Sequence, residues 1–321
     1  MSVKVSVCIP VYGVEKYIER CIRSLFEQTM RDGIEFIFVN DCTPDKSIEI
    51  LERVLSEYPH RKAQTKIIHH EKNGGLVAAR KTGLAHASGE YIIHCDSDDW
   101  VDKNYYETMY ETAVKHNADV AYSPFCVHTG EAIQKSTLPE TVTANVLLQA
   151  ILDNRFQWSL VNKMFRRKIA QDNSLDCPDH ICHSEDLLRV CQMLPNCSGS
   201  VRIPGVYYHY FKGNSAAYTR NFTRKSLDNV TESVAILQKK LSPEYDIGTL
   251  QIFTLFMGII YKLYSAKEFR QVFRNVRFRQ VIRNKNSFPI RMVVLSAGIS
   301  YSMTSGICNV LLKIRKCLQN R

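Results

Sequence analysis

The first hundred residues alternate short hydrophobic strands with helix-like segments, and this alternation restricts the chain to one class of fold. Four short apolar runs rich in β-branched residues predict strands, at Val3–Val11, Glu35–Asn40, Lys66–His70 and Tyr91–Cys95. Between them hydrophobic residues recur at helical spacing, as in the segment from Ile18 to Leu25. Because each gap is long enough for a crossover helix, the strands should pair in parallel in a doubly wound α/β sheet.

The rest of the chain has a different pattern. Between residues 103 and 220 the segments are longer and less regular, with a helix predicted at Tyr105–His116 and a strand at Gly205–Tyr210. From residue 221 onward the spacing is helical, with Leu227–Leu241 and Thr249–Tyr264 as expected helices. We therefore predict three regions, at residues 1–102, 103–220 and 221–321.

The positive charge of the chain is concentrated at its C-terminal end. Residues 262–321 contain thirteen basic side chains and one acid, Glu268, which gives this segment +12. Since the whole chain has +10, residues 1–261 sum to −2. The segment is a basic extension of a slightly acidic body, which suits an anionic membrane surface or a nucleic acid.

The eleven cysteines form no CxxC pair, and several of them lie in apolar runs. This usage is typical of buried thiols in a reducing compartment, and it offers no zinc ligand set. The N-terminal hydrophobic run has the character of a strand and lacks a small-residue cleavage site. We expect a cytoplasmic protein.

In a doubly wound sheet, ligands bind at the carboxyl ends of the strands, so the residues after each strand are the candidates for chemistry. Here they are Tyr12-Gly13, Asp41, Asn73-Gly74-Gly75 and the segment Asp96–Asp99. No GxGxxG motif follows the first strand, and the chain contains no GxxxxGK[ST] motif. A dinucleotide site and a P-loop are both excluded because their phosphate-binding loops are missing.

The acidic segment after the fourth strand is the strongest of these signals. Asp96 and Asp98 project to the same side of an extended chain, which suits Mg²⁺ or Mn²⁺. Asp99 adds a third acid whose repulsion a cation would relieve. The alternative is structural, with Asp99 or Asp102 capping a helix that begins near Lys103.

The other strand ends offer weaker candidates. Asp41 can accept hydrogen bonds from a nucleoside, and its alternative is a turn aspartate ahead of a helix capped by Thr43 with Pro44 at its first position. Asp45 is a candidate for donor binding or a first-turn acid of that helix, which the helix dipole favours. The glycines after Asn73 would let the backbone approach a ligand, and Arg80 lies one turn into the next helix, within reach of a phosphate. The alternative is a flexible turn followed by a surface arginine.

Taken together, four motifs across residues 3–215 resemble the family 2 glycosyltransferases of GT-A fold. They are the run Val5–Tyr12, Val39-Asn40-Asp41 with Asp45, Asn73-Gly74-Gly75-Leu76 with Ala79-Arg80, and Asp96-Ser97-Asp98-Asp99. Gly13 departs from the pattern, because the family usually has Asn there. The resemblance implies a Rossmann-like nucleotide-sugar-binding half at residues 1–102, an acceptor-binding half at 103–220, and a mixed central sheet.

The resemblance also implies an inverting enzyme of the bacterial polysaccharide and capsule type, with a UDP-sugar as donor and Mn²⁺ or Mg²⁺ as cofactor. Carried over to this sequence, it assigns Asp186 as the catalytic base with Glu185 supporting it, and Asp98 as the metal ligand. Asp96 with Ser97 would face the ribose. The remaining donor-binding residues would be Pro10, Tyr12, Asp41, Asp45, Asn73, Gly75 and Arg80.

Three further features have alternatives that stay open. Glu185 and Asp186 would also suit the first turn of a helix capped by Ser184. His209 is a weaker candidate for the metal or the diphosphate, since a histidine in a strand more often has a structural role. Lys163 and Arg166 are candidates for contact with an anionic acceptor.

The basic extension has the pattern of a membrane-surface segment. Its basic residues surround apolar ones over residues 262–291, and Met292–Leu312 then has no charge for 21 residues. Serines and glycines favour an interfacial or re-entrant position of Met292–Leu312 over a span, and packing on the catalytic domain is a further alternative. We expect no nucleic-acid partner, because the extension has no readout motif.

The sequence therefore predicts a hexosyl- or N-acetylhexosaminyltransferase bound peripherally at the inner face of the cell membrane. Its acceptor would be a lipid-linked or polysaccharide glycan. One alternative is a catalytically silent scaffold that binds nucleotide sugars at the membrane. Another is a nucleotidyltransferase, which would be expected to have a Gly-rich basic loop after its first strand; this chain lacks that loop.

Overall fold

The computed structural model describes residues 2–136, 140, 142–172, 175, 177–214, 222–274, 276, 281–282 and 286–309. The chain divides into two compact units, which we describe one at a time. The first contains residues Met1–Leu148 and Trp158–Ala217, and the second contains Gln149–Gln157 and Tyr218–Arg321. The longer segment of the second unit begins at Tyr218, and the predicted boundary at residue 221 stays a prediction. The further division of the first unit at residue 102 stays a prediction, and both parts contribute strands to one sheet.

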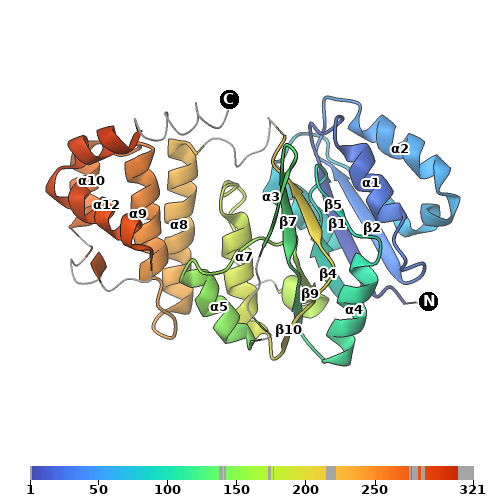
Figure 1. The fold of residues 1–321 in the computed structure, drawn as a ribbon. Helices are drawn as coiled ribbons and strands as arrows, with labels where there is room; N and C mark the ends of the chain where they lie inside the picture. Colours follow the sequence, from blue (N-terminus) through green and yellow to red (C-terminus); the bar gives the residue numbers. More distant parts are fainter. Residues whose placement is uncertain are drawn as a thin grey trace. The chain divides into compact units, whose positions relative to one another are not determined.

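The first unit is built around a seven-stranded mixed sheet (Figure 1). The predicted strands form β1 (Val5–Val11), β2 (Ile34–Asn40), β3 (Thr65–His69) and β4 (Tyr91–His94), all in parallel. The strand β9 (Lys163–Arg166) runs antiparallel to both β4 and β6 (Val120–Tyr122), and β10 (Ser200–Arg202) completes the order β10-β6-β9-β4-β1-β2-β3. The polar residues that follow β1, β2 and β4 therefore meet at one edge of the sheet.

Helices cover both faces of this sheet because successive strand residues point to opposite sides. Val5, Val7 and Ile9 of β1 share a core with residues of α1 (Ile18–Phe26), α2 (Ser47–Glu57) and α4 (Tyr105–Lys115). On the other face, α3 (Leu76–His86) approaches β1 closely at Gly83, where an added Cβ would lie 3.1 Å from that of Cys8. The described cysteines are free; seven of them are buried, Cys42 is exposed, and Cys182 and Cys308 are partly exposed.

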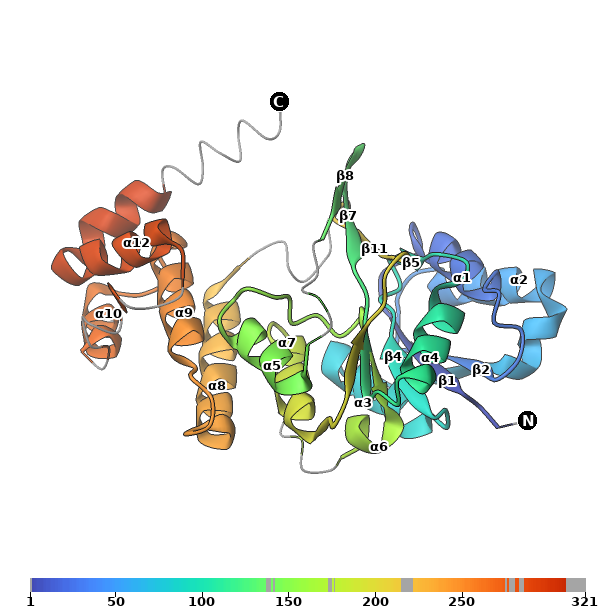
Figure 2. The same ribbon diagram turned by 60° about the horizontal axis from the view of Figure 1, so that its bottom comes forward.

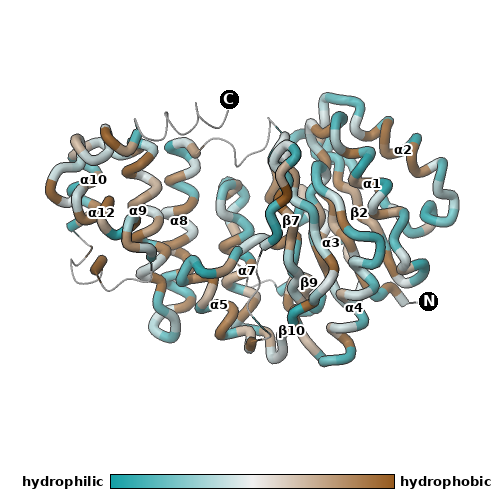
Figure 3. Tube along the Cα trace, in the orientation of Figure 1, coloured by the Kyte–Doolittle hydropathy of each residue, from teal (hydrophilic) through white to brown (hydrophobic). Residues whose placement is uncertain are grey.

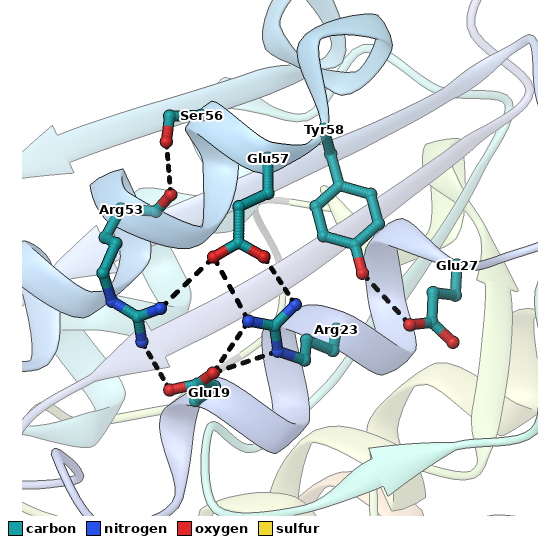
Figure 4. Close-up of polar contacts among 7 residues, drawn as sticks. All are labelled: Glu19, Arg23, Glu27, Arg53, Ser56, Glu57 and Tyr58. Carbon is teal, nitrogen blue, oxygen red and sulfur yellow. Dashed lines mark hydrogen bonds and ion pairs between the residues drawn. The ribbon is translucent and has the colours of Figure 1, made fainter.

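The outer helices α1 and α2 are joined by an ion-pair network on their exposed sides (Figure 4). Arg23 pairs with Glu19 and Glu57 at 2.8 Å each, and Arg53 bridges the same two acids. These side chains are 34–52% exposed, so solvent screens each pair and the network contributes little to the stability of the fold.

A smaller four-stranded sheet lies beside the predicted site, with the order β5-β11-β7-β8 (Figure 2). Its strands are β5 (Trp100–Val101), β11 (Tyr208–Phe211), β7 (Phe125–Thr129) and β8 (Ala132–Lys135). The pairing of β11 with β5 brings residues near position 208 against the acidic segment that follows β4. Among the remaining helical segments of the chain are η1 (Pro59–Gln64), α5 (Ala144–Leu152), α6 (Arg167–Ala170), α7 (Glu185–Met193) and η2 (Leu194–Asn196).

Two structural alternatives for the acidic residues are wrong. Helix α2 begins at Ser47, after Asp45, so Thr43 and Pro44 do not start it. Helix α4 begins at Tyr105 after Asn104, and neither Asp99 nor Asp102 caps it. Both acids instead hold the strand β11, as described below.

The second unit is helical, with α8 (Arg224–Leu241), α9 (Gly248–Ile260), α10 (Ala266–Phe273) and α12 (Phe288–Ile299). Figure 3 shows hydrophobic residues along α9 and α12, and these helices share a core that includes Ile252, Leu255, Phe269, Val294 and Tyr301. The helix α12 ends at Ile299, Ser300 follows it in an extended conformation, and residues 301–309 are again helical. Among the described residues no helix is long and apolar enough to cross a membrane, and residues 310–312 of the Met292–Leu312 segment lie outside the described part of the chain.

Candidate active site

The aspartate after β2 shapes the glycine loop that precedes α3. Asp41 is buried, and its two carboxylate oxygens accept hydrogen bonds from the backbone N–H groups of Gly74 (2.8 Å) and Gly75 (2.7 Å). His70 Nδ1 lies 2.7 Å from Asp41 Oδ1, and Asn73 donates to the Asp41 carbonyl at 3.3 Å. The left-handed backbone of Gly75, with φ +83°, suits glycine. Asp41 therefore fixes the path of the loop that contains two predicted donor-binding residues.

Asp45 joins the loops after β1 and β2. Its carboxylate accepts hydrogen bonds from the Glu15 N–H (2.9 Å), the Thr43 hydroxyl (2.8 Å) and the Ser47 hydroxyl (2.6 Å). Burial opposes ionisation, but these hydrogen bonds outweigh it and hold the pKa of Asp45 below its usual range. Asp45 thus acts on the site by ordering the backbone around it.

The loop after β1 presents an aromatic side chain at the same edge. Pro10 is partly buried in β1, Tyr12 is 51% exposed, and Gly13 has φ +67°. Asn is one of the residues that tolerate such a left-handed backbone, so Gly13 preserves the loop conformation that the family's usual Asn can adopt. The exposed ring of Tyr12 is available to stack on a nucleoside base.

The four residues Asp96–Asp99 divide into an accessible pair and a structural acid. The side chain of Asp96 is 29% exposed and accepts a hydrogen bond from Arg80 at 2.8 Å, and Asp98 accepts one from Asn214 at 2.8 Å. Ser97 is buried between them. Asp99 is fully buried and accepts hydrogen bonds from the Tyr208 hydroxyl and the Phe211 N–H, each at 2.7 Å. Asp99 therefore fastens β11 to the acidic segment.

A divalent cation fits the accessible pair. Burial raises the pKa of Asp98, and the neighbouring Asp96 raises it further, so a cation here would relieve repulsion. Among the described residues no group of three His, Cys, Asp or Glu side chains is placed to hold a metal ion. The donor set suits Mg²⁺ or Mn²⁺, which commonly take one or two carboxylates and complete their shell with phosphate oxygens and water.

The His209 side chain contacts Asp102, His128 and Trp100. Its Nε2 lies 3.0 Å from Asp102 Oδ1, its Nδ1 lies 2.9 Å from His128 Nε2, and its ring stacks on Trp100 with centroids 5.1 Å apart. Asp102 also accepts a hydrogen bond from the Tyr207 N–H at 2.8 Å. Because both ring nitrogens have partners, this geometry favours the structural role of His209 over metal binding.

The predicted base lies at the N-terminus of α7, where the helix dipole favours negative charge. Asp186 is 24% exposed at its side chain, whereas Glu185 is 1% exposed. Asp186 Oδ2 accepts a hydrogen bond from the Leu160 N–H at 3.1 Å, and Arg189 pairs with Glu185 at 2.8 Å. Ser184 precedes the helix but makes no side-chain capping bond.

The two acids of this pair titrate in opposite directions. Burial raises the pKa of Glu185 to about 7, against the opposing charge of Arg80. For Asp186 burial acts the same way, but Arg80 and the hydrogen bonds from neighbouring groups outweigh it and lower the pKa. Asp186 is therefore the carboxylate that is ionised and reachable at neutral pH, as a general base requires.

Arg80 connects the donor side of the site to this pair. Its Nη2 donates to Asp96, and its Nη1 contacts both Glu185 and Asp186. Burial disfavours the charged guanidinium, but the three carboxylates hold the pKa of Arg80 well above its ordinary value. The alternative of a surface arginine is wrong, since Arg80 is 2% exposed.

Lys163 and Arg166 are not placed to meet an acceptor. Lys163 is 1% exposed, and its Nζ donates to the Ser159 carbonyl at 2.8 Å. Arg166 pairs with Glu90 and Asp119, each at 2.9 Å.

Sequence reasoning missed Tyr208 and Asn214, which support the acidic segment. The alternation along the strand at Tyr207–Tyr210 indicated that Tyr208 and His209 face opposite sides, which was a usable signal for Tyr208. The contact of Asn214 with Asp98 spans 116 positions, and no local pattern indicates it.

Comparison with protein families gives one match that covers more than half of the chain. The model of glycosyl transferase family 2 matches residues 6–183, which include the loops at the carboxyl ends of β1, β2 and β4.

Curated relatives are similar over the same region. The uncharacterized glycosyltransferase EpsJ of Bacillus subtilis is 35% identical over 191 residues, which are 57% of this chain and 53% of that protein. TarS of Staphylococcus aureus, named poly(ribitol-phosphate) β-N-acetylglucosaminyltransferase, is 29% identical over 216 residues, 65% of this chain and 36% of that protein. The matched region thus spans about half of the length of EpsJ and about a third of the length of TarS.

Solved structures share the fold over nearly the whole chain. The crystal structure of TarS residues 1–349 in complex with UDP-GlcNAc superimposes with a TM-score of 0.70 at 20% identity, covering 97% of this chain and 91% of that one. The mannosyltransferase PcManGT of Pyrobaculum calidifontis, in complex with GDP-Man and Mn²⁺, gives 0.57 at 12% identity, covering 97% of this chain and 88% of that one.

Proposed function

Because the chain belongs to glycosyltransferase family 2 and has the GT-A fold, we propose that it is an inverting hexosyl- or N-acetylhexosaminyltransferase that uses a UDP-sugar. One observation carries the proposal. An ionised, partly exposed carboxylate, Asp186, is connected through a single arginine to Asp96 at the end of β4. A base for the acceptor thus lies next to the strand end where the donor is expected.

The proposed reaction is a single displacement. Asp186 takes the proton of an acceptor hydroxyl, and that oxygen forms a bond to the anomeric carbon of the donor sugar from the face opposite the nucleotide. The bond between the anomeric carbon and the diphosphate breaks through an oxocarbenium-like state, and its electron pair leaves with UDP. A base in this position accelerates the step by about 10²–10⁴-fold.

On the donor side, the chain's residues have separate tasks. Asp41 and Asp45 order the loops, Asn73 and Gly75 bring backbone to the diphosphate, and Tyr12 stacks on the base. We assign Asp98, with Asp96 beside it, as the carboxylate that holds Mn²⁺ or Mg²⁺. When bound, the cation neutralises the charge of the leaving diphosphate.

The acceptor that we propose is a lipid-linked or polysaccharide glycan. Support comes from the relatives, since TarS is named for transfer to poly(ribitol-phosphate). We place the protein peripherally at the inner face of the cell membrane, where such acceptors are found.

A UDP-release screen of the purified chain with several nucleotide sugars tests the activity. We expect metal-dependent UDP release that EDTA and Asp98→Ala both abolish. We expect Asp186→Asn to lower transfer by at least 10²-fold with nearly unchanged donor affinity. Asp179→Asn is the matched control, because Asp179 is an exposed acid that pairs with Lys81 at the surface.

The other candidate functions give different results in the same screen. A silent scaffold would bind the nucleotide sugar and release no UDP with any acceptor. A nucleotidyltransferase would form a nucleotide sugar and pyrophosphate from a nucleoside triphosphate and a sugar phosphate. Activity that survived EDTA and Asp98→Ala would contradict the metal site.

We also propose that residues 262–321 bind an anionic membrane surface, and the second unit offers a suitable face. Large apolar side chains are exposed on one face of α12, at Phe288, Met292 and Ile299, and on the helical segment after it, at Met303 and Ile307. The opposite side of α12, at Val294 and Ala297, is packed in the core. Apolar side chains on one face and an excess of basic residues in the same segment are typical of interfacial helices.

Liposome flotation tests this binding. The double substitution of Ile299 and Met303 by serine should release the protein from vesicles that contain anionic lipid, and Ile133→Ser, at an exposed position of β8, should not. Equal binding by the double variant and the wild type would contradict the proposed face. Substitution is preferable to deletion of residues 262–321, because deletion would uncover Ile252 and Leu255 of α9.

A further inference from the structure

Three carboxylates from two separate parts of the chain converge on one buried arginine. Asp96 follows β4 on the donor side, whereas Glu185 and Asp186 begin α7, more than one hundred positions away from Arg80. Arg80 is 2% exposed, and both of its terminal nitrogens contact acids. Its Nε has no hydrogen-bond partner among the described residues.

This arrangement leaves Arg80 poorly placed to bind the donor directly. A phosphate could reach its terminal nitrogens only if an ion pair with a buried or partly buried carboxylate broke. Removing one partner from a buried ion pair is strongly unfavourable, because it leaves an uncompensated charge. The structure therefore points away from the donor-binding role that the family resemblance implies for this residue.

We propose that Arg80 is a positioning residue for the base: it holds the Asp186 carboxylate in place and connects it to Asp96 on the donor side. The inference rests on the proposed function, because it takes Asp186 as the base. A positioning role and a donor-binding role predict different results when Arg80 is replaced: the first predicts a change in kcat and its pH dependence, and the second predicts a change in donor affinity.

The other groups around Asp186 support this assignment. The Leu160 N–H holds Asp186 Oδ2 at 3.1 Å, on the carboxylate oxygen that Arg80 leaves free. The turn that contains Leu160 is itself fastened, because Lys163 Nζ donates to the Ser159 carbonyl at 2.8 Å and to Asn162 Oδ1 at 3.0 Å. Each oxygen of the base thus has its own donor.

Charged groups nearby reinforce the same state. A cavity of about 10 Å³, roughly the size of one water molecule, is lined in part by His94 on β4, Lys163 on β9 and Arg189 on α7. Burial and the charges of Arg80 and Arg189 lower the pKa of His94 to about 3, and burial lowers that of Lys163 to about 7. Arg80 and Arg189 thus make the surroundings of Asp186 electropositive, and the hydrogen bond between Glu185 and Asp186 also lowers the pKa of Asp186.

The test separates positioning from donor binding in the full-length protein. Arg80→Lys keeps a positive charge but cannot contact three carboxylates, and Arg80→Gln removes the charge. Arg23→Lys is the matched control, because Arg23 bridges Glu19 and Glu57 on the surface (Figure 4). For each variant we would measure donor affinity by calorimetry, kcat, and the dependence of kcat on pH, after circular dichroism has confirmed folding.

We expect kcat to fall by about 10²-fold in Arg80→Gln, because a small displacement of a base costs about that much. Donor affinity should stay within about twofold of the wild type. The acid limb of the pH profile should move upward by about one to three pH units. An adjacent positive charge lowers the pKa of a carboxyl by that amount, so loss of Arg80 should raise the pKa of Asp186. Arg80→Lys should show smaller changes of the same sign, and it remains informative if Arg80→Gln does not fold.

A weakened donor affinity with an unmoved pH profile would overturn the inference and return Arg80 to the donor site. Variants that behave like Arg23→Lys would overturn it as well. A wild-type protein that releases no UDP with any nucleotide sugar would instead contradict the proposed function, so the two failures are distinguishable.

Discussion

At the scale of single residues, the acids of the site differ by environment more than by type. Asp98 and Asp186 are partly accessible, while Asp99 and Glu185 are buried within networks that the fold itself requires. The same carboxyl group therefore serves the chemistry in one place and the structure in the other. Two predictions follow from this difference.

The first concerns Glu185 and pH. Burial raises the pKa of Glu185 in the folded state to about 7, above its unfolded value near 4.5. The stability that it contributes is full below pH 4.5 and is lost as the pH rises through 7. Relative to the wild type, Glu185→Gln should therefore gain free energy of unfolding between pH 5 and 8, by about 3 kcal/mol at most.

Chemical denaturation at a series of pH values measures this slope. Glu57→Gln is the matched control, because Arg23 lowers the pKa of the exposed Glu57. Its contribution is present at neutral pH and lost as the pH falls through the folded-state pKa, so the control should change with the opposite sign. A flat pH dependence for Glu185→Gln would count against the raised pKa.

The second concerns Tyr208. Its hydroxyl donates to Asp99 at 2.7 Å and accepts from the Asp96 N–H at 3.0 Å, inside a buried segment. Tyr208→Phe should lower the free energy of unfolding by about 1–3 kcal/mol, because it leaves a buried carboxyl group with one partner fewer. Tyr110→Phe, which removes an exposed bond to Glu90, should cost less in the same denaturation experiment. Equal costs would contradict the structural role of the Tyr208–Asp99 bond.

At the scale of secondary-structure elements, one arginine holds the connection that follows α1. Arg61 of η1 is fully buried and donates to the carbonyls of Phe26, Gln28 and Met30 at 2.7–3.0 Å. Arg61→Met should destabilise the protein by about 3–5 kcal/mol, since it leaves several buried carbonyls without donors.

Arg53→Met in the α1–α2 network of Figure 4 provides the comparison, with an expected cost of about 1 kcal/mol or less. The melting temperature of both variants measures the difference. The cost at Arg53 should shrink in high salt, because exposed ion pairs are screened, while the cost at Arg61 should persist. An equal fall in melting temperature in both variants would contradict the prediction that the buried hydrogen bonds of Arg61 stabilise the protein more than an exposed ion pair does.

At the scale of the whole molecule, the second unit contains the excess of basic residues and most of the large exposed apolar side chains. The candidate catalytic residues belong to the first unit. The acidic segment and the base belong to the first unit, and the basic extension to the second. Binding to vesicles should therefore strengthen with the anionic lipid content and weaken as the salt concentration rises. Flotation at several salt concentrations measures this, and UDP release with a water-soluble acceptor should be unaffected by the serine substitutions at positions 299 and 303.

How far the sequence predicts the structure depends on the range of the interaction. The strands β1 to β4 and the helices between them follow from local periodicity, and their bounds agree with prediction within a few residues. The positions of the loops at the strand ends follow from parallel pairing alone. The helix start at Tyr105 agrees with prediction, whereas the start at Ser47 and the residue that precedes each of the two helices were missed, because turn-forming residues there offered several equally suitable caps.

The sequence by itself determined the α/β class, the edge of the sheet where the candidate residues gather, and the family. It did so because strand periodicity and motif spacing are local properties of the chain. Only the tertiary structure decided that Arg80 lies among Asp96, Glu185 and Asp186, that Asp99 holds β11, and that His209 faces Asp102. These contacts join residues up to 112 positions apart, and their partners are selected by the way the chain folds back on itself, which no short pattern encodes.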